Sequence, residues 1–389
     1  MGTFKGTGIK NLKLRSGIYY WRQKIGGVQY SESLQTGNRD EALKCMAEKI
    51  GTVKSGEFSK EKKKMIKQQD TSAGWVDYWP QLKVLDCTIR DGGLMNDHRF
   101  SDEFVFGVHK ALVAAGVDYM ELGYKADKKL FSPDEYGLWK SCDEDGLNRF
   151  FDGVEKGLKL SVMADVGRTN ESDIVPRDKS LIDLVRVACY IHQIPAALDM
   201  VKDAKDKGYE TSVNLMAIST VPEFELNKGL ELIGKSETDM VYLVDSFGSL
   251  YFEQVDDLLR RYIAAMGEGK QVGIHAHNNQ QMAYINTIFA AIHGATMLDS
   301  TIDGLGRGAG NCPTELLLGF LRNPKFKQRP IIEAVEKLMM PLHEQIDWGY
   351  SIPYMITGQL NEHPRAAIKL RESDKKNEFV QFYDEMTGQ

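Results

Sequence analysis

The chain has 389 residues, a length that suits two or three average domains, or one large barrel with a small module. Hydrophobic residues make up 42% and charged residues 27%, which is the composition of a soluble globular protein. No window approaches the roughly 18 consecutive apolar residues of a membrane span. The basic N-terminus lacks the apolar stretch of a secretory signal. Five cysteines without CxxC spacing indicate a reduced, cytoplasmic setting.

The net charge of −6 hides an asymmetry between two parts of the chain. Residues 1–70 contain 15 Lys/Arg and 7 Asp/Glu, a net charge of +8. The remainder holds 34 basic and 48 acidic residues, a net charge of −14. Opposite signs predict two modules with different partners.

The basic front of the chain, residues 1–58, is expected to form a small sheet with one helix. Three runs rich in β-branched and aromatic residues are separated by glycine-containing turns, at 9–15, 18–25 and 28–34. A stretch with helical spacing follows at 39–55, which completes a predicted three-stranded meander with one helix. Residues 59–80 are charged and poor in apolar residues, as expected of a linker.

From residue 83 onward, strand-like and helix-like segments alternate. The eight apolar strand-like runs are 83–87, 119–122, 160–164, 184–188, 211–216, 240–244, 272–275 and 297–301, with helical stretches such as 101–115, 191–207, 253–266 and 280–292 between them. This pattern predicts an α/β fold, a (β/α)₈ TIM barrel over 81–325, followed by a C-terminal helical extension and polar tail at 326–389. A doubly wound open sheet is the alternative, but no GxGxxG follows the first strand to favour it.

Polar residues stand in or just after these runs, where a TIM barrel places its active site. They are Arg90, Asp91, Glu121, Tyr124, Asp165, Arg186, Asn214, Asp245, His275, His277 and Asn311. Gly308 lies in the glycine-rich stretch after the eighth run, which allows close backbone approach to a ligand. We therefore expect one site at the mouth formed by the C-terminal ends of the strands.

The sharpest local feature is the pair His275 and His277. Alternation along a strand puts both imidazoles on one face, and Asp91 from another strand end would complete a set of ligands for one divalent ion. Oxygen and imidazole donors suit Mg²⁺ or Mn²⁺, with Zn²⁺ and Co²⁺ as alternatives. Arg90, next to Asp91, suits an enolate or a ketoacid carboxylate. Each residue also has a purely structural interpretation. One of the histidines could be a structural hydrogen-bonding residue, Asp91 could be a cap or turn residue, and Arg90 could form a salt bridge at the barrel rim.

The string Leu-Asp-Cys-Thr-Ile-Arg-Asp-Gly-Gly at 85–93 resembles the first-strand signature of the DRE-TIM metallolyases, the HMG-CoA lyase-like or pyruvate carboxyltransferase-like barrels. Gly-Ile-His-Ala-His-Asn-Asn at 273–279 resembles their seventh-strand metal motif, and 304–311 resembles their eighth-strand loop. Arg-Asp-Gly-Gly is more similar to the 4-hydroxy-2-oxovalerate aldolase branch than to the synthases. The segments 348–354 and 361–364 resemble an aldolase catalytic domain subgroup.

The resemblance implies metal ligands, a catalytic arginine and substrate contacts at matching positions. Asp91, His275 and His277 would bind Mn²⁺ or Mg²⁺, with Asn311 as a further ligand, and Arg90 would stabilise an enolate. The aldolase branch places a catalytic histidine three residues after the metal aspartate, where this chain has Leu94. The acid/base is therefore open among His98, Tyr124, Lys125 and a metal-bound water. The expected substrate-binding residues are Glu121, Asp165, Arg186, Asn214, Asp245 and Gly308.

The expected function is a divalent-metal-dependent aldolase or lyase that acts on a 2-ketoacid through an enolate of pyruvate type. The alternatives are a Claisen-type acyl-CoA acyltransferase, and a DNA-binding protein whose barrel is a scaffold or ligand sensor. Residues 8–56 resemble the arm-type DNA-binding domain of phage integrases, which implies DNA as a partner of residues 1–58. A basic appendage without a DNA target is the alternative. Small ketoacid and aldehyde substrates and further copies of the chain are the other expected partners.

Overall fold

The computed structural model describes residues 5–6, 12–15, 18–25, 28–54, 79 and 81–389. The chain divides into two compact units, Met1–Trp75 and Val76–Gln389. The linker expected at 59–80 lies outside the described residues except for Trp79.

In the first unit an antiparallel sheet packs against one helix. The strands are β1 (Lys5–Gly6), β2 (Leu12–Arg15), β3 (Ile18–Ile25) and β4 (Val28–Ser33), paired in chain order, and the helix is α1 (Arg39–Lys54). Asn38 Oδ1 caps α1 by accepting hydrogen bonds from the backbone N–H groups of Asp40 and Glu41. The predicted meander with one helix is confirmed, with the two-residue β1 added at its edge.

The second unit is built on a closed barrel of eight parallel strands, as predicted. The strands lie within one or two residues of the expected runs: β5 (Lys83–Asp86), β6 (Tyr119–Tyr124), β7 (Lys159–Asp165), β8 (Leu184–Cys189), β9 (Glu210–Leu215), β10 (Met240–Asp245), β11 (Gln271–Ala276) and β12 (Met297–Ser300). Each strand pairs with its neighbours in chain order, and β12 pairs with β5 to close the barrel. All strand C-termini therefore meet at one mouth.

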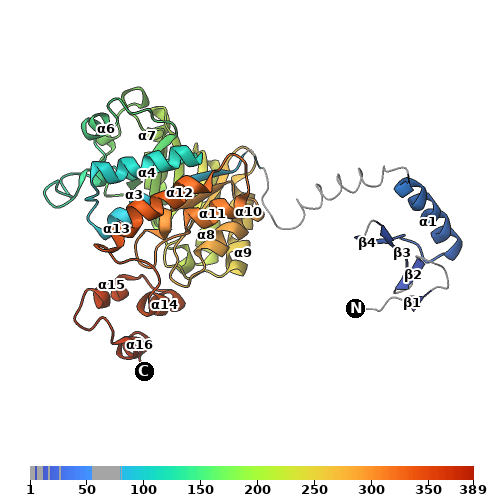
Figure 1. The fold of residues 1–389 in the computed structure, drawn as a ribbon. Coiled ribbons are helices and arrows are strands. Elements are labelled where there is room, and N and C mark those ends of the chain that lie inside the picture. The colour runs from blue at the N-terminus through green and yellow to red at the C-terminus, as the bar shows by residue number, and fades with distance from the viewer. Residues whose placement is uncertain (1–4, 7–11, 16–17, 26–27, 55–78, 80) are drawn as a thin grey trace. The chain divides into compact units, whose positions relative to one another are not determined.

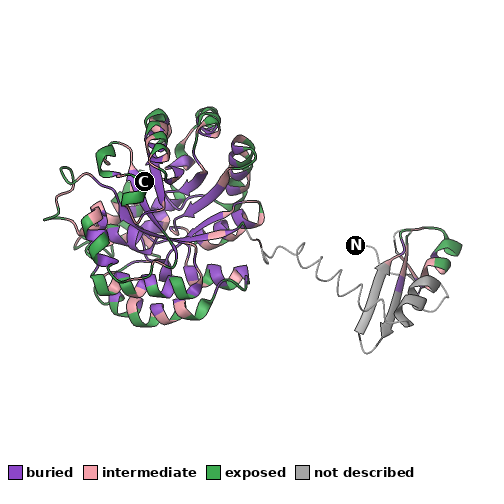
Figure 2. Cartoon of the chain, turned by 90° about the horizontal axis from the view of Figure 1, so that it is seen from above, coloured by how far each residue is buried: buried purple, intermediate pink, exposed green. Residues whose placement is uncertain are grey.

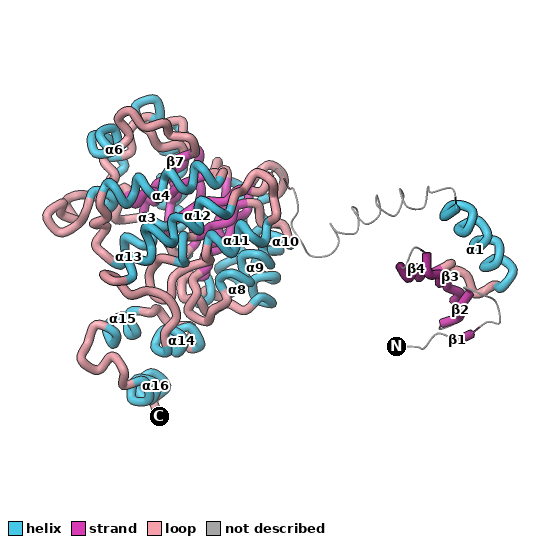
Figure 3. The backbone as a smooth tube through the Cα atoms, in the orientation of Figure 1, coloured by secondary structure: helices cyan, strands magenta, loops and turns pink. Residues whose placement is uncertain are grey.

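Helices surround the strands (Figure 3). They are α4 (Asp102–Ala115), α5 (Leu138–Ser141), α6 (Glu144–Phe150), α7 (Ile194–Asp206), α8 (Glu223–Lys235), α9 (Phe252–Met266), α10 (Ala283–Ile292), α11 (Thr314–Leu321) and α12 (Gln328–Ala334). Their inward faces are buried against the strands while their outer faces are exposed (Figure 2). After β7 the chain forms two 3₁₀ turns in place of an α-helix, because residues 166–183 lack a helical apolar stripe and contain Pro176.

The C-terminal extension begins on the outside of the barrel and ends in a small core of its own. Helix α12 packs against α4, and α13 (Met340–His343) follows. Helices α14 (Ile352–Gln359), α15 (Arg365–Arg371) and α16 (Phe379–Thr387) then come together below the barrel in Figure 1. Their buried side chains cluster with Ala309 of the loop after β12, which anchors the extension at the barrel mouth. The expected polar tail thus contains a helix, α16, whose Phe382 is buried.

No helix among the described residues is both long and apolar enough to cross a membrane.

Candidate active site

A short helix, α3 (Thr88–Gly92), carries two of the expected site residues into the barrel mouth. It follows β5 directly and is held by Asp86, whose carboxylate accepts hydrogen bonds from the backbone N–H and the hydroxyl of Thr88 at 2.9 and 2.8 Å. Burial raises the pKa of Asp86 to about 7. Because α3 is fully buried, Arg90 and Asp91 have fixed positions at the C-terminal mouth of the barrel.

Asp91, His275 and His277 lie together in a buried cluster. One potential ligand atom of each residue lies within 4.8 Å of the other two. His275 Nε2 is 3.5 Å from Asp91 Oδ2, and His277 Nε2 is 3.9 Å from the same oxygen. Burial lowers the pKa of His277 to about 3, so its imidazole is neutral and offers a lone pair.

The donor atoms of this cluster fit a divalent cation. Asp91 Oδ1, His275 Nε2 and Asn311 Oδ1 are buried and have no hydrogen-bond partner among the described residues. Asn311 donates through Nδ2 to Asp91 Oδ2 at 2.6 Å, which leaves its carbonyl oxygen available. Buried polar atoms are rarely left unpaired without a ligand, and this set of carboxylate, amide oxygen and imidazole suits a divalent metal ion.

A closed ring of charged contacts supports the cluster from below. Arg90 Nε donates to Glu121 Oε2 at 2.7 Å, and the same oxygen accepts from Arg186 at 2.9 Å. Arg186 also pairs with Asp299, which in turn accepts from His275 Nδ1 at 3.0 Å. Arg90 Nη1 lies 3.3 Å from Asp91 Oδ1 and closes the ring.

This ring sets the protonation and orientation of the ligands. Burial opposes ionisation of Asp91, but Arg90 and the two histidines hold its pKa well below the usual value. Three carboxylates face two guanidinium groups in the ring, which favours a further cation beside them. The bond to Asp299 fixes the tautomer of His275 with the proton on Nδ1, so that Nε2 faces Asp91.

Replacing Asp299 with asparagine should weaken metal binding about 10- to 100-fold, the usual cost of losing a partner behind a ligating histidine. The amide retains the shape of the side chain but no longer holds His275 with a negative charge. Titration of the metal-free protein with Mn²⁺ would measure the loss. Asp118→Asn, at the opposite end of the barrel, is the control, and equal Mn²⁺ affinity in both variants would contradict the role given to Asp299.

A cavity of about 410 Å³ opens above the cluster. Seven of the residues expected from the sequence line it: Arg90, Asp91, Tyr124, Asp165, Asn214, His275 and His277. Leu94 also lines it, at the position where the aldolase branch has its histidine.

Six expected residues do not line the cavity. Glu121 and Arg186 lie in the ring beneath it, fully buried. Asp245 accepts backbone hydrogen bonds from Ser249 and Leu250 and so holds the loop after β10. The remaining three are Asn311, beside Asp91, Gly308, in the loop after β12, and His98.

His98 is placed behind the cavity wall. It is 1% exposed, and its ring packs edge-on against Tyr124 with centroids 5.4 Å apart. A Cβ atom added to Gly93 would lie 2.1 Å from His98 Nδ1, so the glycine is required for this close approach. Burial lowers the pKa of His98 to about 3, which makes it a weak base. Lys125 points elsewhere, because its amino group donates to Cys142 O and Glu144 Oε1.

Four basic residues of the cavity were missed in the sequence: Arg168, Arg307, His363 and Arg365. Arg307 lies in the glycine-rich loop after β12, and His363 lies in the 361–364 segment that resembles an aldolase subgroup. Both segments stand out in the sequence, but no local pattern places either of them at the barrel mouth.

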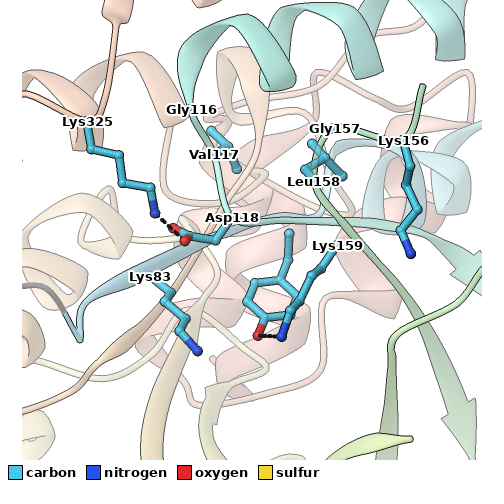
Figure 4. Close-up of a pocket in the computed structure, with 10 residues that line it drawn as sticks. Lys83, Gly116, Val117, Asp118, Lys156, Gly157, Leu158, Lys159 and Lys325 are labelled. Carbon is cyan, nitrogen blue, oxygen red and sulfur yellow. Dashed lines mark hydrogen bonds and ion pairs between the residues drawn. The ribbon is translucent and has the colours of Figure 1, made fainter. Parts of the chain in front are cut away.

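A second, open cavity lies at the other end of the barrel, lined by residues near the starts of β5, β6 and β7 (Figure 4). Its lysines are largely neutralised, as Lys325 pairs with Asp118 and Lys159 with Glu210. The cavity at the C-terminal mouth, by contrast, is lined by side chains with nitrogen atoms that form no hydrogen bond among the described residues, namely Arg90 Nη2, His275 Nε2 and Arg307 Nε.

A closed parallel barrel with a buried Asp-His-His set and an adjacent arginine at its C-terminal mouth defines a metal-binding (β/α)₈ enzyme. A family model described as HMGL-like matches residues 188–335. The chain is 34% identical over 265 residues to a 4-hydroxy-2-oxovalerate aldolase of Carboxydothermus hydrogenoformans, covering 67% of this chain and 78% of the relative. It is 31% identical over 238 residues to 4-hydroxy-2-oxovalerate aldolase 1 of Nocardia farcinica, covering 61% and 68%.

Solved structures agree with these relatives. The N-terminal domain of a putative aldolase from Bacteroides vulgatus matches with a TM-score of 0.65 at 29% identity, covering 77% of this chain and 99% of that one. HMG-CoA lyase from Brucella melitensis matches in fold with a TM-score of 0.55 at 16% identity, covering 68% and 99%. The chain belongs to the DRE-TIM metallolyase superfamily, with 4-hydroxy-2-oxovalerate aldolases among its relatives, and is a metal-dependent carbon–carbon lyase.

Proposed function

We propose that this protein cleaves or forms the C3–C4 bond of a 4-hydroxy-2-ketoacid, with pyruvate as one product or substrate. Asp91, His275, His277 and Asn311 would hold the divalent ion, Mn²⁺ or Mg²⁺. The observation that supports this most is the position of Arg90 beside the ligand set. Its Nη2 is buried, has no partner among the described residues, and belongs to a side chain on the cavity wall.

When bound, the ion would polarise the 2-keto group of the substrate and offset its negative charge. Arg90 would donate to the same oxygen as charge develops there. In the cleavage direction a base removes the proton of the 4-hydroxyl, the C3–C4 bond breaks, and its electron pair becomes the C2–C3 double bond of an enolate. The aldehyde leaves, and protonation at C3 gives pyruvate. Aldol addition follows the same steps in reverse.

Asp165 is the residue that we assign as the base. It is the last residue of β7, it lines the cavity, and burial raises the pKa of its carboxyl group. A raised pKa makes a carboxylate a better proton acceptor near neutral pH. Tyr124, whose pKa burial also raises, keeps its proton and can donate to a substrate oxygen.

Asp165→Asn should therefore lower kcat for cleavage about 100- to 1,000-fold without changing Mn²⁺ affinity. Steady-state pyruvate release and metal titration would be measured on the same preparation. Asp173→Asn, on an exposed 3₁₀ turn, is the control. A kcat within about threefold of the parent enzyme would transfer the role of base to another group.

The function itself is tested by incubating the protein with pyruvate in deuterated water and with racemic 4-hydroxy-2-oxopentanoate. We expect metal-dependent deuterium incorporation into the pyruvate methyl group, and metal-dependent release of pyruvate from the hydroxyketoacid. Chelation should stop both, and Mn²⁺ or Mg²⁺ should restore them. Thiol release from acetyl-CoA in the presence of a ketoacid, without either of these activities, would favour a Claisen-type acyltransferase.

For the first unit we propose DNA binding by residues 1–58, supported by the net charge of +8 in residues 1–70. Arg15, Arg22 and Lys24 of the sheet would contact the phosphates or enter a major groove, and the side chains of these three residues lie outside the described residues. Duplex binding that weakens steeply with salt and is lost on deleting residues 1–75 would support this proposal.

We also propose a reducing cytoplasmic location, in line with five unpaired cysteines. We further propose that the protein forms a homo-oligomer, which light scattering would test.

A further inference from the structure

A basic cluster forms part of the cavity wall; it is made of Arg307 from the loop after β12 and of His363 and Arg365 from the C-terminal extension. The segment before α15 crosses the mouth, where Asn361 bonds to Ser249 of the β10 loop and to the carbonyl of Ser219. Pro364 lies against Gly308 of the β12 loop. The cluster is therefore anchored on three strand-end loops and is part of the cavity wall.

Within the cluster, hydrogen-bond donors outnumber acceptors. Arg307 Nη1 lies 3.1 Å from His363 Nε2, while the backbone N–H of Arg365 points at His363 Nδ1, also at 3.1 Å. Both neighbours are donors, yet a neutral imidazole has only one acceptor nitrogen. Burial, with Arg307 and Arg365 nearby, lowers the pKa of His363 to about 4, so the ring stays neutral and has one acceptor nitrogen for two donors. An acceptor from outside the protein would relieve this conflict.

The positive charge of the cluster is also uncompensated. Among the described residues no carboxylate lies within ion-pair distance of Arg307 or Arg365. Arg307 donates through Nη2 to the carbonyl of Ser246 at 3.0 Å, which fixes the guanidinium, and its Nε is buried without a partner. By contrast, Arg90 at the metal end is paired with Glu121 and Asp91. A positioned guanidinium with a free donor is suited to a carboxylate or phosphate.

We propose that Arg307, His363 and Arg365 bind a second anionic group of the substrate, at the end remote from the 2-ketoacid. This inference rests on the proposed function, because the metal and Arg90 hold the ketoacid end of the same cavity. The substrate class is then a 4-hydroxy-2-ketoacid with a terminal carboxylate or phosphate. The aldehyde released on cleavage carries that anion.

The test compares three cleavage substrates: 4-hydroxy-2-oxopentanoate, with a neutral end; 4-hydroxy-2-oxoglutarate, with a terminal carboxylate; and 2-keto-3-deoxy-6-phosphogluconate, with a terminal phosphate. For the natural chain we expect kcat/KM to be about 10- to 100-fold higher for at least one anionic substrate than for the neutral one, as charge-assisted hydrogen bonds allow. The better anionic substrate identifies carboxylate or phosphate as the group bound. Deuterium exchange of pyruvate, which needs only the metal end, is measured in parallel.

Arg307→Gln should reduce this preference to less than about threefold, chiefly by raising KM for the anionic substrate. Arg365→Gln, which alters an exposed side chain, should reduce it in the same direction and covers the case that Arg307→Gln fails to fold. Arg329→Gln, on the outer face of α12, is the matched control and should keep the preference.

Exchange of pyruvate without any preference for an anionic substrate would overturn this inference and leave the proposed function standing. A preference that survives in both Arg307→Gln and Arg365→Gln would overturn it as well. Absence of both exchange and cleavage would count against the proposed function itself.

Discussion

Replacing His275 with alanine should abolish metal-dependent pyruvate release, by at least about 1,000-fold, because metal polarisation supplies several kcal/mol of transition-state stabilisation. The substitution removes Nε2, a buried metal-ligand atom that lies 3.5 Å from Asp91 Oδ2. It also leaves Asp299 without its histidine partner. Asp91→Asn should have a comparable effect, since it removes the negative charge while preserving shape.

The measurements are Mn²⁺ titration, pyruvate release and the melting temperature of each variant. His293→Ala, at the exposed end of α10, is the matched control and should retain activity and metal binding. If His275→Ala folds and still releases pyruvate at the parent rate with added Mn²⁺, the site of catalysis lies elsewhere in the chain.

Replacing Arg90 with lysine should lower kcat for cleavage about 100- to 1,000-fold, the usual cost of removing one preorganised donor to a developing oxyanion. Lysine keeps the positive charge but lacks the guanidinium fork, in which Nε donates to Glu121 while the separate Nη2 is left for the substrate oxygen. Metal affinity should change much less than kcat, because Asp91 and both histidines remain.

Deuterium exchange of pyruvate gives an independent reading of this role. If Arg90 stabilises the enolate, exchange and cleavage should slow by similar factors in the lysine variant, since both pass through that enolate. Arg99→Lys, whose guanidinium donates to Asp134 O on the surface, is the control. A loss of thermal stability with both rates intact would show that Arg90 is only a structural ion-pair partner of Glu121.

The barrel was predictable because each strand is a short apolar run followed by polar residues, and this signal repeats eight times. Asp91, His275 and His277 could be proposed from their places at strand ends. Glu121 and Arg186 were expected to touch substrate but lie in the ring beneath the cavity. Each is the third residue of its strand, whereas Asp165 is the last of β7. A strand advances about 3.3 Å per residue, so a residue in the middle of a strand lies deeper in the barrel than the last residue. The position within each strand therefore distinguishes residues beneath the cavity from residues that line it.

The remainder of the site could not be read from local pattern. His363 and Arg365 come more than 60 residues after the last barrel strand, and only the tertiary fold returns them to its mouth. The backbone of α3 depends on Asp86, a buried carboxylate that reads in sequence as an ordinary strand residue. The C-terminal core depends on Ala309, a small residue in a loop that draws attention for its glycines.

The ligand atoms of Asp91, His275 and Asn311, which form no hydrogen bond among the described residues, also couple the free energy of unfolding to the metal content of the surroundings. An ion that binds only the folded chain raises its unfolding free energy by about 2.7 kcal/mol at a free concentration 100 times the dissociation constant. The melting temperature would then follow the logarithm of free metal concentration. Ranking Mg²⁺, Mn²⁺, Zn²⁺ and Co²⁺ by the melting shift each produces would identify the ion that the site selects, before any substrate is known.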